Sequence, residues 1–306
     1  MATFTPSGVM TALVTPFQPD GSINWNALPA LIEHQVDAGV TGIAVTAGSG
    51  EYVTLRPEER IEVVRRAAAI LRGRVPLVAG VLAPDTGSAV EASLAARDAG
   101  ADALLLLTPY YVSPSPAGIV THFRAVSESL TCPIILYNIP ARTNINLDLA
   151  TLTQLVELPG VVGIKECDRD LGRVAWKIKH LGDRLAFLSG DDDLCIALWS
   201  LGGKGAIMSS TNLTAPLAVS CFAAAQAGDW DTARDIFYSR LLPFIRLYRG
   251  ADHPGQLKQA LGLAGFAVGT GRAPLQPVNE QRLEEIEQGM RELGLIDLGR
   301  QPVTAG

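Results

Sequence analysis

The sequence has few cysteines, no long hydrophobic run and no excess of positive charge. Its four cysteines (Cys132, Cys167, Cys195 and Cys221) are widely spaced and form no C-x-x-C pair, a pattern typical of a reduced, cytoplasmic chain rather than a disulfide framework. No apolar run is long enough to span a bilayer, and the N-terminus lacks signal-peptide features. The net charge of −6 gives no support for nucleic acid as a partner.

Several familiar catalytic motifs are also missing. The four histidines show no H-E-x-x-H or other metal-ligand spacing, so no metal site is predicted. Gly48-Ser49-Gly50 lacks the outer glycines of a G-x-S-x-G elbow, and Gly202-Gly203-Lys204-Gly205 lacks the P-loop pattern. Metal, serine-nucleophile and P-loop chemistry are therefore unsupported.

What the 306 residues do contain is a series of short apolar runs separated by amphipathic stretches. Continuous runs such as Ala103–Leu107 fit strands that are buried on both faces, as in a parallel sheet. The eight runs are Val9–Phe17, Thr41–Gly48, Pro76–Val81, Ala101–Pro109, Pro133–Pro140, Val161–Cys167, Leu185–Asp191 and Gly205–Thr211.

Helical patterns lie between these runs. Residues 57–66 begin with proline and acidic residues, which favour a first helical turn, and residues 88–99 end at Gly100, a helix stop. Eight strand–helix units predict a (β/α)8 TIM barrel. A doubly wound sheet is the alternative, but it usually has fewer strands and often a glycine-rich first turn, which Thr15–Pro19 does not provide.

The chain changes character after about residue 228. Residues 230–248, 256–267 and 279–293 read as three helices with no further strand. We therefore predict a catalytic barrel over residues 1–228 and a C-terminal helical extension, packed on the barrel, over residues 229–306.

Lys165 is the most informative single residue, because it ends an apolar, β-branched run. A lysine at such a place is commonly a solvated rim residue. Burial, however, disfavours the ammonium form, so a buried amine can act as a nucleophile near neutral pH and form a Schiff base with a ketone.

Polar residues at the ends of other runs support a nucleophilic role for Lys165. The carboxyl ends of barrel strands share one mouth, so these residues would lie near the lysine. Tyr137 lies one strand-to-strand step before Lys165 and could transfer protons, although a core tyrosine is the simpler reading. The Gly48-Ser49-Gly50 turn, with the Ser49 hydroxyl, suits a carboxylate. Arg142 could pair with a second carboxylate in fork geometry.

These segments resemble the dihydrodipicolinate synthase / N-acetylneuraminate lyase family of class I, pyruvate-type aldolases. The likeness runs from about Val9 to Leu293. The segments that carry it are Leu13-Val14-Thr15-Pro16-Phe17, Gly48-Ser49-Gly50-Glu51, Thr108-Pro109-Tyr110-Tyr111, Tyr137-Asn138-Ile139-Pro140-Ala141-Arg142-Thr143, Gly163-Ile164-Lys165-Glu166 and Leu188-Ser189-Gly190-Asp191-Asp192.

The resemblance implies a role for each matching residue. Lys165 would form the imine, Tyr137 would shuttle protons, Tyr111 would reach across a tight dimer interface into the neighbour's site, and Arg142 would meet a second carboxylate. It also implies a homotetramer built as a dimer of dimers and no metal or organic cofactor beyond the covalent imine to Lys165. Two positions would line the pocket with their main chain: Gly190 and Ile207.

Gly48 departs from the family's synthases, which the resemblance leads us to expect to carry two consecutive threonines here. The first would link two tyrosines in a hydroxyl relay, and the second would hold the pyruvate carboxylate. Ser49 can serve the carboxylate, but Gly48 cannot pass a proton. Water, Thr46, another group or a shorter relay would have to substitute.

The sequence therefore predicts a Schiff-base-forming lyase or synthase that acts on pyruvate or a related 2-oxo acid. The first interpretation is a dihydrodipicolinate synthase-like condensation of pyruvate with aspartate semialdehyde. The alternative is a catabolic aldolase or dehydratase of a 2-keto-3-deoxy sugar acid or 4-hydroxy-2-oxoglutarate, which the Gly48 departure favours. A further alternative is a non-catalytic regulator that binds 2-oxo acids.

Overall fold

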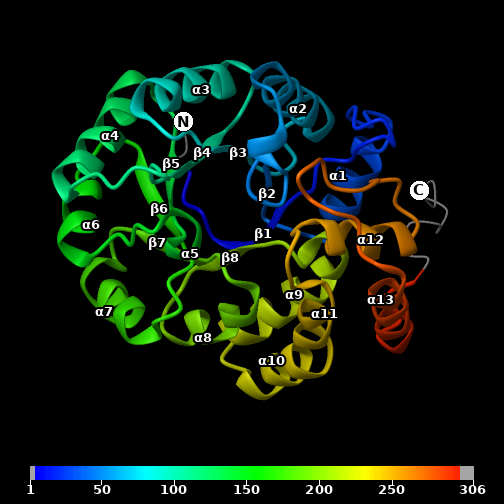
Figure 1. Cartoon of the computed structure of the whole chain (residues 1–306). Coiled ribbons are helices and arrows are strands. Elements are labelled where there is room, and N and C mark those ends of the chain that lie inside the picture. The colour runs from blue at the N-terminus through cyan, green and yellow to red at the C-terminus, as the bar shows by residue number, and fades with distance from the viewer. Residues whose placement is uncertain (1–3, 297–306) are drawn as a thin grey trace.

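The computed structural model of the chain describes residues 4–296, and its centre is a closed barrel of eight parallel strands in sequence order (Figure 1). Each strand falls on one predicted apolar run, so the (β/α)8 prediction is confirmed and the doubly wound alternative is wrong. The strands are β1 (Gly8–Ala12), β2 (Gly42–Val45), β3 (Leu77–Val81), β4 (Ala103–Leu107), β5 (Ile134–Asn138), β6 (Val161–Glu166), β7 (Ala186–Ser189) and β8 (Gly205–Met208).

Helices surround the barrel, and short helical turns follow three of the strands. They are α1 (Leu28–Asp37), η1 (Tyr52–Thr54), α2 (Pro57–Leu71), α3 (Thr86–Asp98), α4 (Pro116–Ser129), α5 (Pro140–Thr143), α6 (Leu149–Leu155), α7 (Leu171–Leu181), η2 (Asp192–Leu194), α8 (Cys195–Ser200) and α9 (Thr211–Gln226).

Side-chain caps fix where many of the helices begin. At the start of α3, the Asp85 carboxylate accepts the Ser88 amide at 3.0 Å, and at the start of α7 the Asp170 carboxylate accepts the Arg173 amide at 3.0 Å. Such caps satisfy amides that have no partner within the helix. The helices therefore start just beyond the strand-end loops, which leaves those loops free to carry function.

The alternating side chains of the strands divide the apolar core into two parts. One part fills the space between strands and helices and includes Ile43, Leu104 and Phe187. The other fills the inside of the barrel, where Tyr137 and Ile207 belong to the same cluster. Continuous apolar runs thus arise because both faces of each strand are buried.

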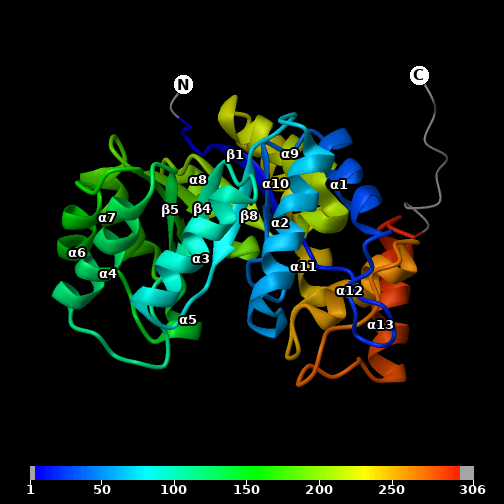
Figure 2. The same ribbon diagram turned by 90° about the horizontal axis from the view of Figure 1, so that it is seen from above.

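The C-terminal segment forms the predicted helical extension, with α10 (Trp230–Ile236), a π-helical turn η3 (Phe237–Leu241), α11 (Leu242–Tyr248), α12 (Gly255–Leu263) and α13 (Glu280–Glu292). Helices α12 and α13 lie together at one side of the barrel in both views (Figures 1 and 2). The boundary at residue 228 stays a prediction, and residues 297–306 of the predicted extension lie outside the described residues.

Candidate active site

A cavity of about 620 Å³ opens at the carboxyl ends of the strands. Residues from the ends of β2, β5, β6, β7 and β8 line it, as expected for a barrel mouth. The C-terminal extension contributes another part of the wall with the following residues: Tyr248, Arg249, Gly250, His253, Pro274 and Leu275. The extension is therefore part of the site.

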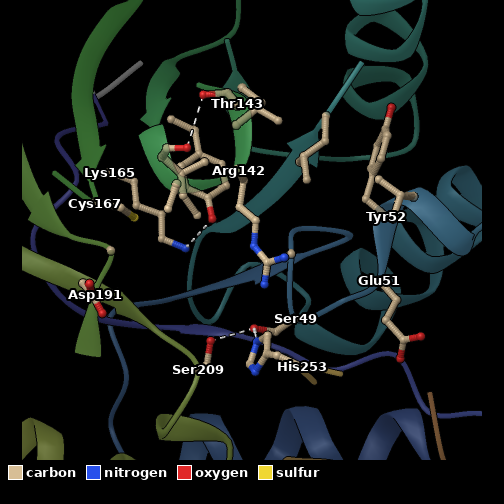
Figure 3. Close-up of a pocket in the computed structure, with 18 of the residues that line it drawn as sticks. Ser49, Glu51, Tyr52, Arg142, Thr143, Lys165, Cys167, Asp191, Ser209 and His253 are labelled. Atoms are coloured by element: carbon tan, nitrogen blue, oxygen red, sulfur yellow. Dashed lines mark hydrogen bonds between the residues drawn. The ribbon is translucent and has the colours of Figure 1, made fainter. Parts of the chain in front are cut away.

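Lys165 and Tyr137 lie opposite each other on the paired strands β6 and β5, and both side chains face this cavity. Lys165 Nζ lies 3.5 Å from Tyr137 Oη (Figure 3), and both side chains are buried, with 4% and 5% exposed. The contact is long for a hydrogen bond. The structure thus brings together the amine and the phenol that the sequence selected.

The pKa of Lys165 is set by opposing influences of burial and of neighbouring side chains. Burial lowers the pKa of this amine, but the neighbouring Tyr137, Cys167 and Asp192 side chains act in the opposite direction, and the net pKa is raised from its ordinary value. The direction of this pKa is therefore opposite to the effect of burial alone, on which the expectation of an uncharged amine rested. Lys165 must lose a proton before its nitrogen can attack a carbonyl carbon.

Gly190 lines the cavity, as predicted, and gives room to the stem of Lys165. A Cβ atom at position 190 would lie 2.3 Å from Cys167 Sγ and 2.8 Å from Lys165 Cε. These distances are far shorter than van der Waals contact, so any larger residue would displace Lys165. The burial of Cys167 raises the pKa of its thiol to about 12, so the thiol is neutral at physiological pH.

The Gly48-Ser49-Gly50 turn follows β2, and Gly48 and Ser49 line the same cavity. Ser49 Oγ lies 2.7 Å from Ser209 Oγ and 3.3 Å from His253 Nε2 (Figure 3). Within residues 4–296, neither the Ser49 amide nor the Gly50 amide has a hydrogen-bond acceptor. The turn can therefore present two backbone donors and a hydroxyl to an anion.

Gly48 lies beside Tyr137, as its match to the relay position implies. A Cβ atom at position 48 would lie 3.8 Å from Tyr137 Oη, which is ordinary contact. Thr46 does not substitute, because its hydroxyl donates to the Gly80 carbonyl at 3.2 Å and is buried. The phenol therefore has no neighbouring hydroxyl from these two positions.

Arg142, on the short helix α5, points into the cavity across from Ser49 (Figure 3). Within the described part of the chain, no carboxylate lies within 4.0 Å of its guanidinium. An arginine without a carboxylate partner at the rim of a cavity is suited to an incoming anion.

The side chains of two predicted site residues do not line this cavity. Tyr111 is 99% exposed, with a φ of 71°, and is absent from the lining of the cavity. Ile207 is fully buried in the apolar filling of the barrel, beneath the mouth. This burial concerns the side chain of Ile207, whereas the expectation concerned its main chain, so main-chain lining of the pocket by Ile207 stays a prediction.

Sequence reasoning missed Ser209 and His253, which both contact Ser49. Ser209 follows β8 directly, so the rule that selected the other strand ends would have found it. No sequence signal marked His253, because it lies in a loop of the extension whose path depends on packing. Asp192 holds the β8 end in place by accepting the amides of Ser209 at 3.2 Å and Ser210 at 2.6 Å.

An amine and a phenol in adjacent strands, with an anion-binding turn beside them, define a (β/α)8 barrel enzyme with carbonyl chemistry at its mouth. Comparison with known proteins gives the family. The model of the dihydrodipicolinate synthetase family matches residues 5–293. This chain belongs to that family.

The relatives agree with this assignment. The chain is 39% identical to the 4-hydroxy-tetrahydrodipicolinate synthase of Maridesulfovibrio salexigens, over 95% of the chain and 100% of the relative. It is 38% identical to the synthase of the same name from Pseudomonas aeruginosa, over 95% of the chain and 99% of the relative.

The fold is also similar to that of a solved structure. The crystal structure of the chloride-inhibited dihydrodipicolinate synthase from Acinetobacter baumannii complexed with pyruvate is similar, with a TM-score of 0.92 and 34% identity, over 95% of the chain and 100% of that structure. The chain is therefore an enzyme of the lyase type, not the non-catalytic regulator that we considered.

The structure also bears on metals and membranes, for the residues it describes. Between residues 4 and 296, no group of three His, Cys, Asp or Glu side chains is arranged to hold a metal ion. In the same part of the chain, every helix is too short or too polar to cross a bilayer.

Proposed function

We propose that the enzyme joins Lys165 to pyruvate as an imine and condenses the resulting enamine with aspartate semialdehyde. The observation that carries this proposal is the Lys165–Tyr137 pair, which faces a cavity beside the anion-binding Ser49 turn. The name that the curated relatives share supports the reaction, and the pyruvate complex of a similar structure supports the first substrate.

The geometry suits each step of this chemistry. After losing a proton, Lys165 Nζ attacks the C2 carbonyl carbon, and loss of water from the carbinolamine gives an iminium ion. The iminium withdraws electrons from C3, whose proton then leaves. The enamine carbon attacks the aldehyde carbon, and the aldehyde oxygen takes up a proton. Water then hydrolyses the iminium that re-forms, which releases the product as a 2-oxo acid and restores the amine. Tyr137 Oη is placed to move protons to and from the carbinolamine oxygen, and Arg142 to hold the second substrate's carboxylate.

One observation favours a second reaction on the same imine. Gly48 supplies no hydroxyl beside Tyr137, so the relay that the resemblance implies for a synthase is interrupted. The alternative is cleavage or dehydration of a 2-keto-3-deoxy sugar acid or of 4-hydroxy-2-oxoglutarate. Both reactions need the same Lys165 and Ser49 geometry and differ in the second half of the substrate.

The remaining expectations belong to this proposal. The imine requires no metal or organic cofactor, because the lysine itself supplies the electron-withdrawing group. Tyr111 and Val112 expose 99% and 53% of their surface at the β4–α4 loop, which supports a homotetramer in which Tyr111 enters a neighbour's pocket. The four cysteines are free and buried, which supports a location in the cytoplasm.

Borohydride trapping tests the imine directly. The enzyme is incubated with pyruvate, reduced with borohydride and weighed by intact-protein mass spectrometry; we expect one reduced adduct per chain. Lys165→Ala should gain no adduct, and Lys204→Ala, which removes an exposed lysine away from the cavity, should gain it normally. An adduct on the Lys165→Ala variant would refute the proposal.

A substrate panel separates the two reactions. Turnover is measured with pyruvate plus aspartate semialdehyde, with keto-deoxy sugar acids and with 4-hydroxy-2-oxoglutarate. We expect the highest kcat/KM for the aspartate semialdehyde condensation. A higher value for one of the hydroxylated acids would replace the first candidate by the second without affecting the imine.

A further inference from the structure

Ser49, Ser209 and His253 converge at the pocket wall from three distant parts of the chain. Ser49 follows β2, Ser209 follows β8, and His253 comes from the loop between α11 and α12 in the extension. Figure 3 shows the three side chains together on one side of the cavity, with Lys165 and Arg142 across from them. Ser49 is the centre of the group, because it contacts both of the others.

The imidazole of His253 is uncharged under ordinary conditions. Burial lowers its pKa to about 4; the Asp192 carboxylate opposes this shift, whereas the Arg142 and Lys165 cations reinforce it. A neutral imidazole has one N–H donor and one acceptor nitrogen. The hydrogen bond to Ser49 therefore has two possible directions, depending on which ring nitrogen carries the proton.

The direction of this bond decides what Ser49 can do. The hydroxyl of Ser49 has a single proton and two acceptor positions. If His253 Nε2–H and the Ser209 hydroxyl both donate to Ser49 Oγ, they fill its two acceptor positions and the Ser49 proton is free to point into the cavity. If His253 Nε2 accepts instead, the Ser49 proton is used within the protein and cannot serve a ligand.

A carboxylate ligand selects the first arrangement, because an ionised carboxylate only accepts hydrogen bonds. We propose that His253 is a positioning residue, which donates to Ser49 Oγ and thereby turns the Ser49 hydroxyl toward the carboxylate of the 2-oxo acid. This inference rests on the proposed function, since it concerns the same substrate. It assigns to the C-terminal extension a part in substrate binding, with Ser209 as the second neighbour of Ser49.

The test compares His253→Ala with His253→Asn, whose side-chain amide can still donate to Ser49. The measured quantity is the pyruvate concentration that gives half-maximal borohydride trapping, together with the trapped fraction at saturation. We expect His253→Ala to raise the half-maximal concentration about tenfold, the scale of one hydrogen bond to a charged group. Saturation should still be reached, and His253→Asn should bind within about threefold of the unchanged enzyme.

A double-mutant cycle shows whether His253 acts through Ser49. If it does, adding His253→Ala to Ser49→Ala should cost little beyond the loss from Ser49→Ala alone. A matched control is His180→Ala, which removes an exposed histidine from α7 and should leave binding unchanged.

Three results would overturn the inference: unchanged binding by His253→Ala, independent losses that multiply in the double variant, or His253→Asn binding as weakly as His253→Ala. Circular dichroism checks that each variant is folded, and His253→Asn keeps the test valid if His253→Ala is not. Absence of any adduct on the unchanged enzyme would instead refute the proposed function, so the two failures are distinguishable.

Discussion

On the pocket side of strands β5 and β6, Tyr137 and Lys165 are joined by one long contact of 3.5 Å. On the opposite side, which faces α7, the next residue of each strand makes a much shorter contact: Asn138 Nδ2 donates to Glu166 Oε1 at 2.6 Å. The same strand pair therefore carries loosely held polar groups on one face and tightly held ones on the other.

The helix-side group is a buried, paired network. Lys177 Nζ, from α7, donates to Glu166 Oε2 at 3.0 Å, and both side chains are buried. The other oxygen of Glu166 accepts the Asp168 amide at 2.9 Å as well as the Asn138 amide. Buried charges are costly unless they are paired in this way.

The difference shows how the barrel positions its reactive pair. Neighbouring residues of a strand point to opposite faces, so a slip of one residue would exchange the two sides. Fixing Asn138 against Glu166 therefore also fixes Tyr137 against Lys165. The network holds the pair in register from outside the pocket and leaves the reactive groups free to exchange partners with a substrate.

The largest expected effect is on the pocket side. Lys165→Ala removes the one lysine that lines the cavity in the described residues, so turnover should fall by at least about 10⁴-fold, as for loss of a covalent nucleophile. Lys165→Ala should lower the free energy of unfolding, measured in urea, by less than a substitution in the buried network that faces α7. Turnover by Lys165→Ala within tenfold of the unchanged enzyme would contradict the assignment of the reactive amine to the pocket side of the strands.

A substitution in the buried network that faces α7 should mainly lower stability rather than turnover. Lys177→Met leaves Glu166 charged and buried without its partner, and should lower the free energy of unfolding by about 3–5 kcal/mol. Urea denaturation measures the change. The control is Lys179→Met on the same helix, where the side chain is exposed; equal stability of the two variants would show that the buried pair does not hold the strands.

Tyr137→Phe should separate catalysis from binding. The phenyl ring keeps the packing, but no hydroxyl remains to transfer a proton, so kcat should fall by about 10²–10³-fold. The pyruvate concentration for half-maximal trapping should change much less. Parallel losses in both quantities would count against proton transfer by Tyr137, and Tyr238→Phe, an exposed tyrosine of the extension, serves as the control.

The smallest expected effect concerns Gly48. Gly48→Thr adds a hydroxyl near Tyr137 Oη in space that the structure leaves open, and should raise the aspartate semialdehyde condensation about fivefold, the scale of one hydrogen bond. Gly48→Ala adds only the methyl group and should give no gain. Equal rates for the two variants would mean that a missing hydroxyl does not limit the reaction.

Much of the barrel could be predicted from the sequence, for a local reason. A strand that is buried on both faces needs a continuous apolar run, and runs such as Ala103–Leu107 carry that signal within a few residues. The opposition of Tyr137 and Lys165 followed as well, because consecutive units of a barrel pair their strands. The direction of the Lys165 pKa could not be predicted, since it depends on Tyr137, Cys167 and Asp192, whose distances are set by the fold.

The sequence by itself determined the number and order of the strands and the identity of the amine and phenol, because those features follow from local apolar pattern and strand adjacency. The family followed from the resemblance of its motif segments. The tertiary structure alone decided that the Ile207 side chain is buried in the core and that His253 lies beside Ser49. These placements depend on side-chain direction and on the path of a distant loop, which are set by packing across the whole chain.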